Sequence, residues 1–193
     1  MKSVVVFCGS GDGNHAGFTS EAFLLGKKLA EQDIQLIYGG ARIGVMGAVA
    51  EGALSRGGKA IGVIPHFLRT KEVAHEGLTE LIVVPSMHER KMKMHELCDG
   101  IIALPGGFGT LEELFEVLTW AQLGLHQKPI GIMNTNGYYN HLLSLIDSML
   151  QKEFITHHHR SLFVVSETVD ELLQMMKAFI PPPIKKWIHT DET

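Results

Sequence analysis

The chain has 193 residues, of which 45% are hydrophobic and 20% are charged. These are ordinary values for a globular domain and exclude extended disorder, and a chain of this length buries about 70% of the surface that its unfolded form exposes. Seventeen Lys and Arg against 21 Asp and Glu leave a formal charge of −4, so there is no general electrostatic reason to bind nucleic acid or an anionic membrane.

The cysteines and the N-terminus indicate a cellular compartment. Cys8 and Cys98 are too few for a disulfide framework and stand in apolar surroundings, which suits a reducing environment. The N-terminus lacks the length and cleavage pattern of a signal peptide, and no apolar stretch reaches membrane-spanning length. We therefore expect a cytoplasmic protein with neither a membrane nor a nucleic acid as partner.

Short apolar runs alternate with amphipathic segments along the chain. Strands are predicted at 4–8, 34–38, 60–64, 81–84, 101–104, 129–133 and 162–165. Helices are predicted at 20–30, 44–56, 87–98, 111–125, 139–150 and 168–178, the second of them rich in Ala and Gly and closely packed. Strands that are apolar throughout, with helices between them, predict an α/β fold with a parallel sheet covered on both faces. We expect one domain, 1–180, and a Pro-rich tail, 181–193.

Open parallel sheets bind ligands at the carboxyl ends of their strands, so the segments after each strand are the informative ones. The segment 104–113 (LPGGFGTLEE) places three glycines between a strand and a helix. Glycines let the backbone approach a ligand closely, and the free N–H groups of the helix start favour a phosphate. The alternative is structural: Thr110 and Glu113 fit a capping box that only closes the helix start.

Two more segments also lie between a predicted strand and the helix that follows it. In 85–91 (PSMHERK), Ser86 and Glu89 fit a capping box that leaves Arg90 and Lys91 one turn into the helix. These two cations form either a solvated basic face or a group that holds a phosphate or a ribose hydroxyl. The segment 38–47 (YGGARIGVMG) supports a phosphate or only permits tight helix–sheet packing.

Several better-known motifs are absent or incomplete. No Gly-x4-Gly-Lys-Ser/Thr occurs, which argues against a P-loop. The segment 11–16 loosely matches a dinucleotide fingerprint, but no acidic residue follows the next strand to hold a ribose, so an NAD site is weak. Three adjacent histidines, 157–159, have no supporting ligand pattern nearby, and we expect a polar loop there. No metal and no cofactor is therefore expected.

The segment 105–113 resembles the Lonely guy (LOG) family, the cytokinin riboside 5′-monophosphate phosphoribohydrolases, which are often labelled lysine decarboxylases. The family pattern Pro-Gly-Gly-x-Gly-Thr-x-x-Glu is met in full, and the segments 86–91, 39–47 and 119–124 also fit. The resemblance runs from about residue 4 to about residue 173. Molybdenum-cofactor carriers share the glycine motif, but together with the Arg90 segment the motif is much more specific.

The resemblance implies a Rossmann-like, doubly wound sheet, usually in a homodimer. It implies hydrolysis of the N-glycosidic bond of AMP or an N6-substituted riboside 5′-monophosphate, giving free base and ribose 5-phosphate. Arg90 and Glu113 match the family's catalytic pair: Glu113 would stabilise the oxocarbenium-like sugar and activate water, and Arg90 would orient the ribose phosphate. The substrate contacts that it implies are Glu72, Met87, Lys91, Gly106, Gly107, Phe108, Gly109, Thr110, Leu111, Glu112 and Thr119.

Two other hypotheses stay open at this point. One is a carrier of a phosphorylated nucleotide or a molybdenum-type cofactor that performs no hydrolysis, and the other is an interaction protein with a vestigial site. A carrier needs the glycines but not Arg90 with Glu113. The sequence does not distinguish plain adenine from prenylated adenine as the natural base.

Overall fold

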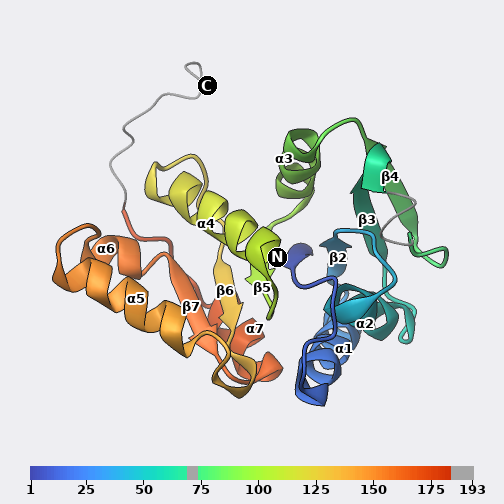
Figure 1. Cartoon of the computed structure of the whole chain (residues 1–193), viewed down its shortest axis with the longest axis horizontal. Coiled ribbons are helices and arrows are strands. Elements are labelled where there is room, and N and C mark those ends of the chain that lie inside the picture. The colour runs from blue at the N-terminus through green and yellow to red at the C-terminus, as the bar shows by residue number, and fades with distance from the viewer. Residues whose placement is uncertain (69–73, 184–193) are drawn as a thin grey trace.

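Seven parallel strands form a sheet in the order β4-β3-β2-β1-β5-β6-β7 (Figure 1). The computed structural model describes residues 1–68 and 74–183. The strands are β1 (Ser3–Phe7), β2 (Gln35–Tyr38), β3 (Ala60–Pro65), β4 (Glu80–Val84), β5 (Gly100–Ala103), β6 (Ile130–Met133) and β7 (Phe163–Ser166). Every neighbouring pair runs parallel, which confirms the predicted α/β fold with a doubly wound parallel sheet.

Helices cover both faces of this sheet. One layer comprises α1 (Ala16–Glu31), α2 (Gly44–Leu54) and α7 (Val169–Lys177), and the other comprises α3 (Met87–Leu97), α4 (Phe108–Gln122) and α5 (Asn140–Gln151) (Figure 1). Alternate residues of β1 serve the two layers. Val4 and Val6 belong to the core beneath α1, α2 and α7, whereas Val5 and Phe7 belong to the core beneath α3, α4 and α5. Burial on both faces explains why the strands read as continuous apolar runs.

All predicted strands and helices are present, and the differences lie at their ends and in short elements. α1 begins at Ala16, four residues before the prediction, because Nδ1 of His15 accepts a hydrogen bond from the Gly17 N–H and caps the helix. The expected polar loop at residues 157–159 is instead a short helix, α6 (His157–Arg160), capped by Thr156. Two 3₁₀ turns, η1 (His66–Leu68) and η2 (Thr135–Gly137), complete the described chain.

α1 and α2 lie unusually close together because glycines occupy their contact. A Cβ added to Gly26 of α1 would stand 2.0 Å from the carbonyl oxygen of Val49, and one added to Gly52 of α2 would stand 2.1 Å from that of Phe23. No side chain fits at such distances from backbone atoms. The structure thus confirms the closely packed helix that the Ala- and Gly-rich segment predicts.

The order of the strands creates one point where successive connections leave in opposite directions. The chain moves from β1 outward to β2, β3 and β4, then returns to β5 beside β1 and continues outward through β6 to β7. A crevice therefore opens at the carboxyl ends of β1 and β5, where ligands bind in sheets of this kind. In residues 1–68 and 74–183, no helix is both long enough and apolar enough to cross a bilayer.

We expect Gly26→Ala to lower the melting temperature by about 5–10 °C, because the added methyl group forces α1 away from α2. Ser20→Ala, on the exposed side of the same helix, is the matched control and should shift melting by less than about 2 °C. Thermal unfolding followed by circular dichroism compares the two variants. Equal melting temperatures would show that the close approach of the two helices does not need glycine.

Candidate active site

A cavity of about 320 Å³ lies at the carboxyl ends of the central strands. This volume is at the lower end of the range of small-molecule sites, about 300–1,000 Å³. Its walls come from the segment after β1, the end of β2, and the first turns of α3 and α4, so residues distant in the sequence meet there. The residues that line it include Cys8, Gly9, Ser10, Gly39, Met46, Met87, Arg90, Gly107, Phe108, Gly109, Thr110, Glu112 and Glu113.

The start of α4 presents backbone N–H groups to this cavity. Gly107 is the N-cap residue and no side chain caps the helix, so the first-turn N–H groups lack a capping partner. A Cβ added to Gly107 or Gly109 would meet no protein atom within 4 Å. Protein packing therefore does not require glycine at either position, whereas a ligand that approaches the backbone would. An anion such as a phosphate is the group that such a helix start binds best.

The capping-box hypothesis for Thr110 and Glu113 is wrong. α4 begins at Phe108, so Thr110 is already the third residue of the helix and Glu113 is nearly two turns in. In contrast, Ser86 does cap α3, where its Oγ accepts a hydrogen bond from the Glu89 N–H at 3.2 Å. Glu113 thus has no part in closing its own helix.

The Glu113 carboxyl opens on the cavity but is otherwise enclosed by protein. Burial raises its pKa to about 7, the Arg90 charge lowers it, and the neighbouring Glu112 charge raises it. Desolvation dominates, because a carboxylate loses more hydration here than Arg90 replaces. The group therefore titrates near neutral pH, where it can both accept and release a proton.

Arg90 is buried and held in a fixed orientation by the ends of two strands. Its Nε donates to the carbonyl oxygen of Val63 at 3.0 Å, and its Nη2 donates to that of Gly39 at 2.9 Å. A Cβ at position 39 would stand 2.2 Å from Nη2, so the guanidinium requires glycine there. The solvated-face alternative is wrong for Arg90, and packing explains at least Gly39 of the glycine segment after β2.

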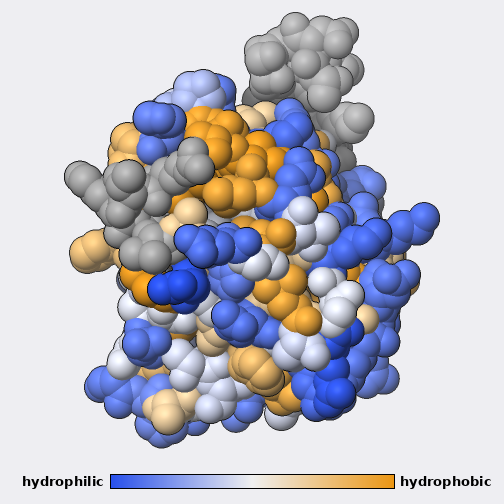
Figure 2. Space-filling model, turned by 90° about the vertical axis from the view of Figure 1, so that its right-hand side faces the viewer, coloured by the Kyte–Doolittle hydropathy of each residue, from blue (hydrophilic) through white to orange (hydrophobic). Residues whose placement is uncertain are grey.

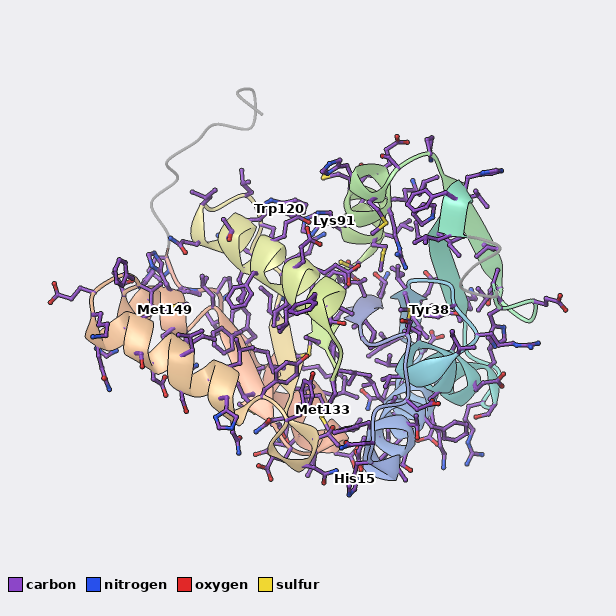
Figure 3. All side chains as sticks on the ribbon, in the orientation of Figure 1. His15, Tyr38, Lys91, Trp120, Met133 and Met149 are labelled. Atoms are coloured by element: carbon purple, nitrogen blue, oxygen red, sulfur yellow. The ribbon has the colours of Figure 1, made fainter. Side chains whose placement is uncertain are left out.

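Lys91 is also buried, but it does not line the cavity. Its Nζ donates to Oε1 of Glu112 at 2.5 Å and to Oε1 of Glu116 at 2.9 Å, so that it bridges α3 and α4. Figure 3 shows Lys91 in the space between these two helices. The solvated-face alternative is therefore wrong for Lys91 too, and the Nζ donates to these two carboxylates. Direct contact between Lys91 and the substrate stays a prediction.

The other predicted substrate contacts separate into those inside and those outside the cavity. Met87, Phe108 and Glu112 line it, and the Phe108 ring is 94% exposed at its mouth. Gly106 lines an adjoining cavity of about 340 Å³, where Tyr138 Oη donates to its carbonyl oxygen.

Two predicted contacts, Leu111 and Thr119, line neither of these cavities. Leu111 packs into the hydrophobic core beneath α4. Thr119 lies about three turns from the start of α4, donates to the Phe115 carbonyl oxygen, and lines a different cavity between α4 and α5. Glu72 lies outside the described residues.

Sequence reasoning missed the contribution of β1. Cys8, expected as a small core residue, is indeed buried, but it also lines the cavity beside Gly9 and Ser10. Burial raises the pKa of its thiol far above the ordinary value, so the group is a neutral wall and not a nucleophile. The signal that could have found these residues is that β1 is the first strand of a doubly wound sheet and therefore central.

The histidines at 157–159 are part of a helix terminus. His159 Nδ1 accepts a hydrogen bond from the Thr156 N–H and completes a capping box, and His158 Nε2 lies 2.5 Å from the Pro183 carbonyl oxygen. Within residues 1–68 and 74–183, no group of three or more His, Cys, Asp or Glu side chains is arranged to hold a metal ion.

Comparison with known proteins supports the resemblance along most of the chain. The sequence model of a family described as "Possible lysine decarboxylase" matches residues 46–176. The chain is 45% identical over 181 residues to the probable cytokinin riboside 5′-monophosphate phosphoribohydrolase LOGL6 of Oryza sativa subsp. japonica, covering 94% of this chain and 72% of the relative. It is 44% identical to the cytokinin riboside 5′-monophosphate phosphoribohydrolase LOG1 of Arabidopsis thaliana, covering 94% and 85%.

Solved structures with the same fold are more distant in sequence. The molybdenum cofactor binding protein of Rippkaea orientalis superimposes with a TM-score of 0.69 at 22% identity, covering 92% of this chain and 97% of that one. The Moco carrier protein of Chlamydomonas reinhardtii gives 0.68 at 21% identity, covering 91% and 95%. These similarities show the Rossmann-like fold alone, whereas the sequence comparisons show that the chain belongs to the LOG family of cytokinin riboside 5′-monophosphate phosphoribohydrolases.

Proposed function

We propose that this protein is a phosphoribohydrolase that cleaves the N-glycosidic bond of a nucleoside 5′-monophosphate to free base and ribose 5-phosphate. One observation carries the proposal: a carboxyl group with a pKa of about 7, Glu113, shares a cavity with the buried Arg90 and with the uncapped start of α4. The first can assist the reacting sugar, and the other two offer positive charge and N–H donors to a phosphate.

The reaction needs few groups. The bond between the sugar C1′ and the base nitrogen breaks with its electron pair going to the base, which leaves an oxocarbenium-like sugar. The ionised Glu113 stabilises that charge and accepts a proton from the attacking water, whose oxygen bonds to C1′. The same proton then passes from Glu113 to the departing base, which leaves as the neutral free base and restores the carboxylate. The α4 start anchors the phosphate and thereby places C1′ beside Glu113, which converts remote binding energy into orientation.

The substrate class follows from the relatives and from the chemistry of the cavity. Proteins about 45% identical to this chain are named for cytokinin riboside 5′-monophosphates, so we propose AMP or its N6-substituted forms as substrates. Decarboxylation of lysine has no basis in the cavity, because its described lining includes no lysine for a Schiff base. A carrier role would need the α4 start but would have no use for a carboxyl group held near neutrality.

We also propose a homodimer that forms over the edge of the sheet. Figure 2 shows the side of the molecule on which β4 forms the edge of the sheet, and hydrophobic residues gather in the upper half of this face. Val83 of β4 and Met92 of α3 are 40% and 47% exposed. An exposed sheet edge beside apolar side chains is a surface that a second copy can cover.

Substrate selectivity tests the phosphate anchor. We expect kcat/KM for AMP to exceed that for adenosine by at least about 100-fold, because adenosine lacks the charge-assisted contacts at the α4 start, each worth about 1.5–3 kcal/mol. Chromatography of the released adenine measures both rates. Similar rates for the two compounds would show that the helix start does not hold the phosphate.

Glu113→Gln separates chemistry from structure. We expect kcat/KM to fall by about 10²–10⁴-fold, and the wild-type rate to rise with pH to a plateau above about 7 as Glu113 ionises. Glu96→Gln, an exposed carboxylate on α3, is the matched control and should keep its activity. Steady-state hydrolysis of AMP is measured between pH 5.5 and 9 in steps of about half a pH unit. The data compare each variant with the wild type and show how the wild-type rate depends on pH.

The stability of the same variant has a definite sign. Because the folded state raises the pKa of Glu113, the neutral carboxyl is favoured, and its stabilising contribution is lost as pH rises through about 7. The permanently neutral Gln variant should therefore melt at the same temperature as the wild type or higher at pH 8. If Glu113→Gln loses activity and its melting temperature also falls strongly, the role of Glu113 is structural, and the claim that its role is catalytic is contradicted.

Light scattering tests the assembly. We expect twice the chain mass at micromolar concentration, and Val83→Lys with Met92→Lys should give the mass of one chain, since two charges cannot be buried in an apolar interface without a large desolvation cost. A single-chain mass for the wild type would refute the homodimer.

A further inference from the structure

Five charged side chains of α3 and α4 lie close to one another. α3 contributes the cations Arg90 and Lys91, and α4 contributes the carboxylates Glu112, Glu113 and Glu116. The structure divides them into two groups. Arg90 and Glu113 line the cavity, whereas Lys91 holds Glu112 and Glu116.

Lys91 is tightly engaged by its two carboxylates. Only 9% of its side chain is exposed, and its Nζ lies within hydrogen-bond distance of both Glu112 and Glu116. Burial lowers the pKa of Lys91, but the hydrogen bonds to Glu112 and Glu116 outweigh this and raise the pKa above the ordinary value. Lys91 is therefore a permanent cation at physiological pH, and its donors point at α4.

The carboxylates of Glu112 and Glu116 lie at or near the cavity, where their negative charges would weaken the binding of an anion. Glu112 lines the same cavity as the α4 start, and Glu116 lies one turn further along the helix. Their charges oppose a bound phosphate and also oppose ionisation of Glu113, whereas the Lys91 charge favours it. The other charged group that acts on Glu113 is Arg90 from α3. The Cys8 thiol after β1 also lines the cavity, but burial raises its pKa so that it stays neutral.

We propose that Lys91 is a positioning residue: it holds Glu112 and Glu116 against α3 and offsets their charge, so that Glu113 alone acts in the cavity and the phosphate meets no uncompensated carboxylate. This inference rests on the proposed hydrolase function for its kinetic consequences. It differs from direct contact between Lys91 and the substrate phosphate, because in that case the two carboxylates would have no part in the effect.

Charge arithmetic separates the two possibilities. Lys91, Glu112 and Glu116 together carry −1 in the wild type, −2 in Lys91→Met, and −1 again in Lys91→Met combined with Glu116→Gln. If Lys91 acts through the carboxylates, the second change reverses the first. If Lys91 binds the phosphate itself, the double variant still lacks the ammonium group that contacts the phosphate, and its activity stays as low as that of Lys91→Met.

The variants are expected to fold. The Glu112 side chain is 55% exposed and that of Glu116 is 25% exposed, so water can solvate both carboxylates when the Lys91 charge is removed. Methionine keeps most of the apolar stem that packs between the helices. Lys93→Met is the matched control, because Lys93 lies on the same helix and pairs with the exposed Glu96 at 3.7 Å.

Two readouts test the proposal. One is KM and kcat for AMP as a function of pH, and the other is the titration of the Glu113 carboxyl followed by carbon-13 NMR in protein labelled at glutamate, with Glu113→Gln to assign the signal. We expect Lys91→Met to raise KM about 5- to 10-fold at pH 8 and to move the Glu113 titration upward by about half a pH unit or more. The double variant should recover at least half of each change, and Lys93→Met should show neither.

The outcomes are distinguishable. An unchanged Glu113 titration in Lys91→Met, an equal effect of Lys93→Met, or a double variant as impaired as the single one would overturn the proposal. Absence of AMP hydrolysis in the wild type would instead refute the proposed function, and the NMR titration would still decide whether Lys91 controls the charge around Glu113.

Discussion

The site depends on one constraint, the desolvation of the Glu113 carboxyl at the start of α4. A carboxyl group in water is ionised at neutral pH and is a weak base, but here burial raises its pKa to about 7. The neighbouring features are arranged around that burial. Arg90 supplies a compensating charge, and the carbonyl oxygens of Val63 and Gly39 keep the guanidinium in place. A buried carboxyl group with a raised pKa lowers the stability of the folded state, and groups of this type are concentrated at functional sites.

The fold explains why these groups meet. The doubly wound sheet brings the ends of β1, β2 and β5 to one edge, and α3 and α4 begin beside it. α4 starts with glycine and not with a capping side chain, so its N–H groups are open to an anion. The open N–H groups and the Glu113 carboxyl thus belong to the same helix and lie within two turns of each other.

Much of this could be predicted from the sequence, because it depends on local patterns. Continuous apolar runs predicted the parallel strands, and the glycines after the strand at residues 101–104 predicted the segment that lines the cavity. The part that could not be predicted depends on side-chain direction. Arg90 and Lys91 are adjacent in the sequence, yet one lines the cavity and the other bridges two helices. The helix start at Phe108 also could not be found from the pattern, because Thr110 and Glu113 fit a capping box equally well.

The central claim is that the cavity breaks a glycosidic bond and does not merely hold a nucleotide. The most direct measurement is to incubate the purified full chain with excess AMP at pH 8 and to quantify all products by chromatography and mass spectrometry. We expect equal amounts of adenine and ribose 5-phosphate, accumulating over many turnovers per chain. AMP that is bound but stays intact, or conversion to adenosine and inorganic phosphate, would contradict the central claim.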